Sequence, residues 1–427
     1  MHARNQPRCN ILVLLVVTLI ESVPLWCAGA DTVPGIPDTT EPITFNLNFE
    51  GASLGQIERI DEQTFRCHVK GQQDERGRNR QASWYFFRLD HVAGRNITIT
   101  LTDFVGEYHN RLGACPMGPD LIPVFSNDGK TWNHFPAMEW DNVKKEATLK
   151  LKPDKETIWI AHIPPYTTRE LSHLLDELAN RPSAIVETIG KTVQGRDIPL
   201  VTVTNPDIPD EGKKIVWLQA RQHAWEAGTS YVMEGALLFI TSNDAEARAL
   251  REKVVFKFTP MVDLDGCANG QVRSNANGFD VNQHWAQVDL RHPEYLRLLP
   301  EIWCTKKAIL NAMEKGRGIN LMVNMHNTET GEFLDTEVTD AATLDLFRRF
   351  EARLVENTSF DPSRKLTVGK LAPDDTNSLY EQKRIPVMLM EQRIGPSKKL
   401  GRQPTIEDRL AFGRQLITEM AKTVLEQ

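Results

Sequence analysis

Between residues 198 and 390 the chain alternates short apolar runs with segments of helical periodicity, and this rhythm restricts the possible fold more than any other feature. The helical segments are expected at residues 231–240, 295–314 and 341–356, and the strand-length apolar runs lie at residues 198–203, 215–218, 254–261, 320–325 and 387–390. Strands that alternate with helices form a mostly parallel sheet covered by helices on both faces. With a helix expected at residues 169–180, the pattern predicts an α/β domain over residues 164–427.

The preceding residues have a different rhythm. Residues 45–49, 97–101 and 147–151 alternate apolar and polar side chains, and turn signals such as Asn127-Asp128-Gly129 lie between such runs. Short strands at this spacing predict an antiparallel β-sandwich over residues 43–163. This segment carries no cluster of metal ligands and no nucleophile with a base, which favours a packing or substrate-guiding role.

The composition sets limits on the function. The chain has 427 residues, 41% apolar and 25% charged, which is enough for two hydrophobic cores. Its net charge is −7 and it contains no long block of Lys and Arg, so nucleic acid is not an expected partner.

The N-terminus has the pattern of a secretory signal. Arg4 and Arg8 precede an apolar run at residues 11–20, and the small residues 28–30 offer a cleavage site. The apolar run is short for a membrane span, and no later segment is long and apolar enough to be one. We therefore expect a signal peptide at residues 1–30, a tail at residues 31–42, and an exported protein, periplasmic or extracellular, without a membrane anchor.

Signal cleavage would leave Cys67, Cys115, Cys267 and Cys304. Four cysteines in an exported chain permit two disulfides, and pairing within each predicted domain is the simplest arrangement. Four free buried thiols explain the sequence equally well.

Chemically useful side chains occur where the predicted parallel strands end. His223 and Glu226 follow residues 215–218, His326 follows residues 320–325, and Glu391 follows residues 387–390. Ligands of such sheets bind beyond the carboxyl ends of the strands. Two histidines and a glutamate can hold one zinc ion per chain and leave a position open for water. A further carboxylate can accept a proton from that water and pass it to a leaving amine. An isolated His or Glu at a strand end is more often a surface residue, but the four together favour a catalytic metal site.

The run at residues 270–285, GQVRSNANGFDVNQHW, has the form G-x-x-R-x-x-x-x-G-x-D-x-N-x-x-W, and Pro260-Met-Val-Asp-Leu-Asp265-Gly266 precedes it. Here the sequence resembles the zinc metallocarboxypeptidases of the carboxypeptidase A type, and most of all their cytosolic carboxypeptidase branch. Residues 48–51, 84–88, 161–167 and 192–199 resemble further segments of that branch, in matched order.

The resemblance implies roles for individual residues. His223, Glu226 and His326 would bind zinc, and Glu391 would be the general base. Arg273 would stabilise the oxyanion of the tetrahedral intermediate, and Asn282 would help to bind the terminal carboxylate of a peptide.

Two positions depart from the family pattern. The Asn-Arg pair of the family reads Asn282-Gln283, so Gln283 lacks the charge of the usual carboxylate-binding arginine. Tyr380 lies only 11 residues before Glu391, too close to match the mobile tyrosine of the family. Arg393 lies two residues beyond Glu391 and would share its face of a continuing strand, so we hypothesise that Arg393 contacts an acidic substrate group, although a salt-bridged or solvent-facing arginine explains it as well.

The preferred function is a zinc metallocarboxypeptidase that removes C-terminal residues from a peptide or protein. Gln283 keeps two alternatives open: a zinc amidase or endopeptidase acting on another amide, such as a cell-wall peptide, and a non-catalytic binding protein with the same fold. The oligomeric state is left open.

Overall fold

The computed structural model describes residues 41–314, 317–369 and 375–426. The predicted signal peptide and all but the last two residues of the predicted tail lie outside these ranges. None of the described helices is both long enough and apolar enough to cross a membrane.

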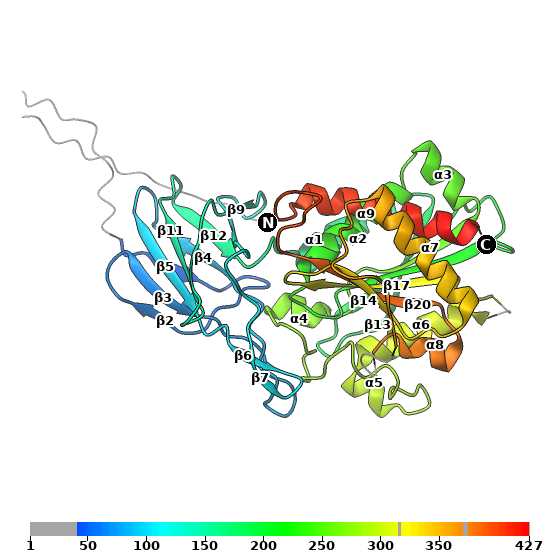
Figure 1. Cartoon of the computed structure of the whole chain (residues 1–427), viewed down its shortest axis with the longest axis horizontal. Coiled ribbons are helices and arrows are strands. Elements are labelled where there is room, and N and C mark those ends of the chain that lie inside the picture. Colours follow the sequence, from blue (N-terminus) through cyan, green and yellow to red (C-terminus); the bar gives the residue numbers. More distant parts are fainter. Residues whose placement is uncertain (1–40, 315–316, 370–374, 427) are drawn as a thin grey trace, which may run out of the picture. The chain divides into compact units, whose positions relative to one another are not determined.

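The N-terminal part contains two five-stranded sheets and a small separate hairpin (Figure 1). In spatial order the first sheet consists of β1 (Thr44–Asn46), β4 (Phe86–Asp90), β12 (Thr157–Ala161), β8 (Val124–Ser126) and β9 (Asn133–His134). The second consists of β10 (Glu139–Asp141), β11 (Glu146–Leu151), β5 (Ile97–Thr102), β3 (Thr64–His68) and β2 (Ile57–Arg59). The hairpin is formed by β6 (Gly106–Tyr108) and β7 (Arg111–Ala114).

These sheets confirm the predicted β domain with one difference. All neighbouring strands of the first sheet are antiparallel, but β3 and β5 of the second sheet run parallel. The alternation that predicted the strands is visible in β5, where Ile97, Ile99 and Leu101 are buried between more exposed threonines. Alternation shows which face of a strand is buried and not which way its neighbour runs.

The remainder of the chain is built on one eight-stranded mixed sheet. Its spatial order is β13 (Ala184–Lys191), β14 (Asp197–Val203), β16 (Val254–Thr259), β15 (Lys214–Ala220), β17 (Leu321–Thr328), β20 (Val387–Arg393), β18 (Phe333–Thr336) and β19 (Thr367–Val368). The four central strands, β16, β15, β17 and β20, are mutually parallel. The next strand on each side, β14 beside β16 and β18 beside β20, runs antiparallel to its neighbour in this centre. The five predicted strands are all present, four of them in this parallel centre.

Helices lie on both faces of this sheet (Figure 1). They are α1 (Thr168–Ala179), α2 (Ala227–Ile240), α3 (Ala245–Arg251), α4 (Leu264–Asn269), α5 (Glu294–Leu298), α6 (Pro300–Ala312), α7 (Ala341–Asn357), α8 (Ser378–Lys383) and α9 (Ile406–Leu425). The predicted α/β class is therefore confirmed.

Local chemistry explains where some of these helices begin and end. Thr167 and Glu170 form a capping box at the start of α1. The single helix predicted at residues 295–314 is two helices, because the chain leaves helical geometry at Leu299 and restarts with Pro300 in the first turn of α6. Proline has no N–H to donate and is tolerated where a helix begins.

Apolar contacts join the two parts of the chain. One core cluster fills the α/β domain, around the fully buried Trp217 and Trp285. A second cluster contains the β-domain interior, including Tyr85, and also Trp225 and Met261 from the α/β domain. Folding of the β domain is therefore coupled to burial of α/β-domain side chains.

The four described cysteines are free thiols, and all but Cys115 are buried. The alternative of two disulfides is wrong for this structure. Burial raises the pKa of the Cys67 and Cys267 thiols to about 12, so both are inert, protonated core groups.

Candidate metal centre

The site lies at the carboxyl ends of the parallel strands β15, β17 and β20. His326 lies on β17 and is the direct cross-strand partner of Glu391 on β20. His223 and Glu226 lie in the turn between the end of β15 and the start of α2. Parallel strands bring residues more than 60 positions apart to one edge, as the sequence predicted.

The turn that carries His223 and Glu226 is held by Arg221. Arg221 is 2% exposed and has a φ of 59°, a left-handed conformation that is uncommon for a residue with a side chain. Its guanidinium donates to the carbonyl oxygens of Ala224 (2.6 Å) and Tyr166 (3.0 Å) and to Ser230 Oγ (3.1 Å). These bonds stabilise a backbone conformation that is unfavourable by itself.

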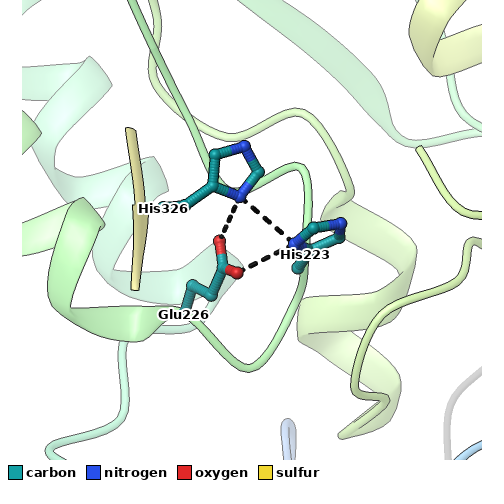
Figure 2. A group of neighbouring side chains, drawn as sticks. All are labelled: His223, Glu226 and His326. Carbon is teal, nitrogen blue, oxygen red and sulfur yellow. Dashed lines mark hydrogen bonds and ion pairs between the residues drawn. The ribbon is translucent and has the colours of Figure 1, made fainter. Parts of the chain in front are cut away.

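Glu226 is the N-cap residue of α2, yet its side chain makes no capping hydrogen bond. Cap residues are usually short polar side chains that accept from the first turn. The Glu226 carboxylate instead points at the two histidines (Figure 2). Glu226 therefore departs from the usual capping pattern because its carboxylate contacts the two histidines.

The three side chains form a compact, buried group (Figure 2). Glu226 Oε1 lies 2.8 Å from His223 Nδ1, and Glu226 Oε2 lies 3.0 Å from His326 Nδ1. The two Nδ1 atoms are 3.2 Å apart. Each residue offers a ligand atom within 4.8 Å of the other two. Three such atoms converging on one point, with nitrogen and carboxylate donors, fit a zinc site that keeps a position open.

The other ring nitrogens of the two histidines are also in contact with polar groups. His223 Nε2 lies 3.1 Å from Asp280 Oδ1, and His326 Nε2 lies 2.8 Å from the side-chain amide of Asn324. Such outer contacts fix the ring orientation of metal-binding histidines. The donor set and its support therefore both fit a metal ion held by His223, Glu226 and His326.

The site favours negative charge on Glu226 and disfavours it on Glu391. Burial opposes ionisation of Glu226, but His326 and His223 outweigh it and lower the pKa of this carboxyl to about 2. Burial raises the pKa of Glu391 well above its usual range, and the nearby Glu226 and Glu329 add to that effect. Glu391 Oε2 is buried and makes no hydrogen bond within the described part of the chain. An orphaned buried oxygen beside a candidate metal site is a feature that needs a functional explanation.

A loop at residues 270–285 supplies the second half of the site. Arg273 Nε donates to Asp280 Oδ2 at 2.5 Å, and the Asp280 carboxylate also contacts His223. Despite burial, Arg273 and His223 hold the pKa of Asp280 far below its usual range. Asp280 thus connects the candidate oxyanion-binding arginine to a candidate zinc ligand.

The N-terminal β domain holds this loop in place through Gln72. Gln72 Oε1 accepts from the backbone N–H groups of Val272 (2.9 Å), Arg273 (2.6 Å) and Ser274 (2.9 Å). Its Nε2 donates to the carbonyl oxygen of Ser274 at 2.7 Å. One side chain therefore fixes three consecutive peptide units of the loop that carries Arg273.

A cavity of about 660 Å³ opens at this edge of the sheet. Five of the eight predicted site residues line it: His223, Arg273, Asn282, Gln283 and Glu391. Asn282 is 6% exposed, and its Oδ1 accepts from Thr376 Oγ1 at 3.1 Å. The rest of the wall comes from β18 and β20, with Phe333, Asp335 and Leu389, from Asp375 shortly before α8, and from the β6–β7 hairpin, with Tyr108, His109 and Arg111.

Arg393 is not among the residues that line this cavity, and its contacts to Glu332 and Asp361 agree with the alternative of an arginine paired within the protein. It is 7% exposed, and its guanidinium donates to the carbonyl oxygens of Asp361 (2.6 Å) and Pro396 (3.0 Å). The alternation of a strand placed it correctly on a face, but the loop after β20 folds back over that face. Tyr380 is likewise away from the cavity and donates to Asp340 Oδ2 at 2.5 Å.

Several residues of the site were not predicted from the sequence. Asp280 is one of them, although it lies in the run at residues 270–285 that carries the family resemblance. Its charge and its place two residues before Asn282 are the signals that point to it. Gln72 and the hairpin residues gave no signal, since their partners lie about 165 to 200 positions away in the sequence.

Comparisons with known proteins agree with this site. Residues 171–333 match the zinc carboxypeptidase family, and residues 45–163 match the cytosolic carboxypeptidase N-terminal domain. The chain is 26% identical to an uncharacterised protein of Zymomonas mobilis, over 74% of this chain and 77% of that one. It is 27% identical to human cytosolic carboxypeptidase 2, over 70% of this chain but only 34% of the human protein. The alignment therefore spans about a third of that vertebrate relative.

Among solved structures, the fold resembles a metallo-carboxypeptidase from Burkholderia cenocepacia, with a TM-score of 0.77, 21% identity and coverage of 90% of this chain and 100% of that one. The fold and the buried His-Glu-His group define a protein of the zinc carboxypeptidase class. The chain belongs to the zinc carboxypeptidase family, in the form that has a cytosolic carboxypeptidase N-terminal domain.

Proposed function

We propose that the protein is a zinc-dependent carboxypeptidase that removes C-terminal residues from peptides. One observation carries the proposal: His223, which belongs to the group of three candidate ligands, lines the same cavity as Arg273 and Glu391, whose Oε2 has no hydrogen-bond partner in the described part of the chain. Catalysis needs a Lewis acid, a base and an oxyanion partner on the same substrate carbonyl.

His223, Glu226 and His326 would hold the metal, and zinc bound there supplies Lewis acidity. Glu391 would take a proton from the attacking water on its free Oε2 and then donate it to the leaving amine. Its buried carboxyl needs positive charge beside it to ionise, so Glu391 is expected to act as a base only in the metal-loaded protein. Arg273 would place its positive charge where the carbonyl oxygen becomes negative.

The cavity wall also favours a particular side chain on the departing residue. Asp335 and Asp375 line it together with Leu389. Burial, with Glu337 and Asp335 nearby, raises the pKa of Asp375 to about 7, and a bound cation would relieve this cost of ionisation. We therefore expect C-terminal Lys or Arg, which combine an aliphatic stem with a positive charge, to be removed fastest.

The test is hydrolysis of a mixed peptide library by the zinc-loaded full chain, with cleavage sites read by mass spectrometry. We expect C-terminal trimming, most of all of Lys and Arg, which falls by about 10²–10⁴-fold in Glu391→Gln while the zinc content stays unchanged. Internal cleavage, or zinc binding without trimming, would support the alternative of a different amide substrate, which Gln283 keeps open. Absence of both zinc and cleavage would favour a binding protein.

A further inference from the structure

Position 283 of the cavity carries a glutamine in place of the usual family arginine, and Arg393 is not among the residues that line the cavity. Among the residues that the structure describes, two arginines line the cavity, Arg111 and Arg273. Arg273 is bonded to Asp280 at 2.5 Å, and its guanidinium lies 5.3 Å from the ring centre of Tyr108. Its charge is therefore balanced within the protein.

Arg111 differs from Arg273 in this respect. Across the described part of the chain, its guanidinium forms no ion pair within 4.0 Å of a carboxylate, and its side chain is exposed toward the cavity. A cation that lines a catalytic cavity and carries an unbalanced charge can recognise an anionic group of the substrate.

The hairpin that carries Arg111 has a defined geometry. Tyr108 and Arg111 pair across a two-residue turn in which His109 and Asn110 have φ values of 49° and 60°. Positive φ at both central positions is the type I′ turn that suits a tight hairpin, and Asn tolerates this conformation. The Asn110 backbone N–H donates to Asn79 Oδ1 at 2.7 Å, which anchors the tip of the hairpin.

The same hairpin contacts the residue that replaces the family arginine. His109 Nε2 lies 3.5 Å from Gln283 Nε2, and both residues line the cavity. Arg111 is two positions further along the hairpin. The positive charge that is absent at position 283 is therefore present on a neighbouring element from the other domain.

We propose that Arg111, presented by the β6–β7 hairpin of the N-terminal domain, binds the terminal carboxylate of the peptide substrate in place of an arginine at position 283. This inference rests on the proposed carboxypeptidase function. It makes the β domain a part of the substrate site. The requirement for a free C-terminus would then come from Arg111, with Gln283 and Asn282 adding hydrogen bonds.

The experiment compares binding of benzoyl-glycyl-lysine with that of its C-terminal amide, by calorimetry on the zinc-loaded Glu391→Gln protein, in which turnover of the peptides is strongly reduced. We expect the free acid to bind about 10- to 100-fold more tightly than the amide, the range of one charge-assisted interaction. Arg111→Gln in this background should reduce the ratio to about one. Leu112→Ala is the matched control, because Leu112 is the next hairpin residue, is 86% exposed and does not line the cavity.

A second variant tests the replacement directly. Adding Gln283→Arg to Arg111→Gln should restore discrimination between acid and amide, because it returns a cation to the family position. An unchanged acid-to-amide ratio in Arg111→Gln would overturn the inference, as would equal binding of acid and amide by the protein with Arg111 intact. If either result is found in a protein that still trims peptides in the library assay, only the proposed role of Arg111 is refuted. If no trimming is found, the carboxypeptidase function itself is refuted.

Discussion

The two halves of the candidate site are held by different parts of the molecule. The metal-binding edge, with His223, Glu226 and His326, is fixed within the α/β domain by parallel strands and by the buried Arg221. The loop with Arg273 is fixed from the other domain, by Gln72. Metal binding should therefore depend on the α/β domain, whereas the placement of Arg273, the candidate oxyanion-binding residue, should depend on the β domain.

Asp280 is the point where the two halves meet, since its carboxylate contacts both His223 and Arg273. Different variants should therefore affect both halves of the site, one half of it, or only the contact between the two domains.

The largest effect is expected from Asp280→Asn. Loss of the charge weakens the contact to His223 Nε2, so zinc affinity should fall by about 10- to 100-fold, the usual effect of losing an outer contact to a metal ligand. Turnover at saturating zinc should also fall, because Arg273 loses its charged partner. Zinc competition with a chelating dye and peptide hydrolysis measure the two effects.

Asp289→Asn is a suitable control for Asp280→Asn. Asp289 lies nine residues later and pairs with the exposed Arg291. We expect this variant to keep both zinc affinity and turnover. If Asp280→Asn also kept both, the two halves of the site would be independent.

A smaller and more selective effect is expected from Gln72→Ala. The three backbone N–H groups of residues 272–274 lose their acceptor, at a cost of about 0.5–1.5 kcal/mol for each hydrogen bond. Arg273 should become less ordered, so kcat should fall by about 10-fold or more while zinc content is unchanged. Steady-state kinetics and metal analysis of the purified protein provide the measurement.

Ile99→Val separates this effect from a general loss of stability in the β domain. Ile99 is fully buried in β5, and losing one methyl group should lower the free energy of unfolding by about 1 kcal/mol without touching the loop. Its kcat should match that of the unchanged protein. A parallel fall of kcat in both variants would mean that the β domain acts only through stability.

The third effect is a pH dependence of folding stability at the contact between the domains. His162 packs between Tyr85 and Trp225, with ring centres 5.3 and 6.0 Å away. Burial lowers its pKa from 6.5 to about 4. The unfolded chain therefore binds a proton below pH 6.5 that the folded chain binds only near pH 4, so stability is lost as the pH falls through this interval.

Between pH 6.5 and 4, His162 should lower the free energy of unfolding by about 1.4 kcal/mol for each pH unit. Above pH 6.5 it should cause no change. Denaturant unfolding of the full chain between pH 7.5 and 4 should show a shallower decline for His162→Phe, whose side chain does not titrate. The comparison uses the slopes and not the absolute stabilities, because the substitution also changes packing. Equal slopes would show that His162 is solvated in the folded state.

The sequence determined the parts of the site that depend on strand ends. His223, Glu226, His326 and Glu391 could be predicted to converge because each follows an apolar strand, and parallel strands end at a common edge. Asn282, Gln283 and Arg273 could be placed near them from the family run at residues 270–285. The contacts of Arg393 with Asp361 and Pro396 could not be predicted, because alternation along a strand does not reveal which loop covers it.

Only the tertiary structure revealed what the β domain adds. Gln72 and Arg111 lie in segments with no motif, and nothing local in the sequence indicates that they contact residues far along the chain. The pairing of β3 with β5 in parallel is equally hidden, since alternation does not encode strand direction. Periodicity and chemistry at strand ends are local properties that a sequence carries openly, whereas a contact between two domains depends on the packing of both surfaces. That packing decides which cation faces the cavity.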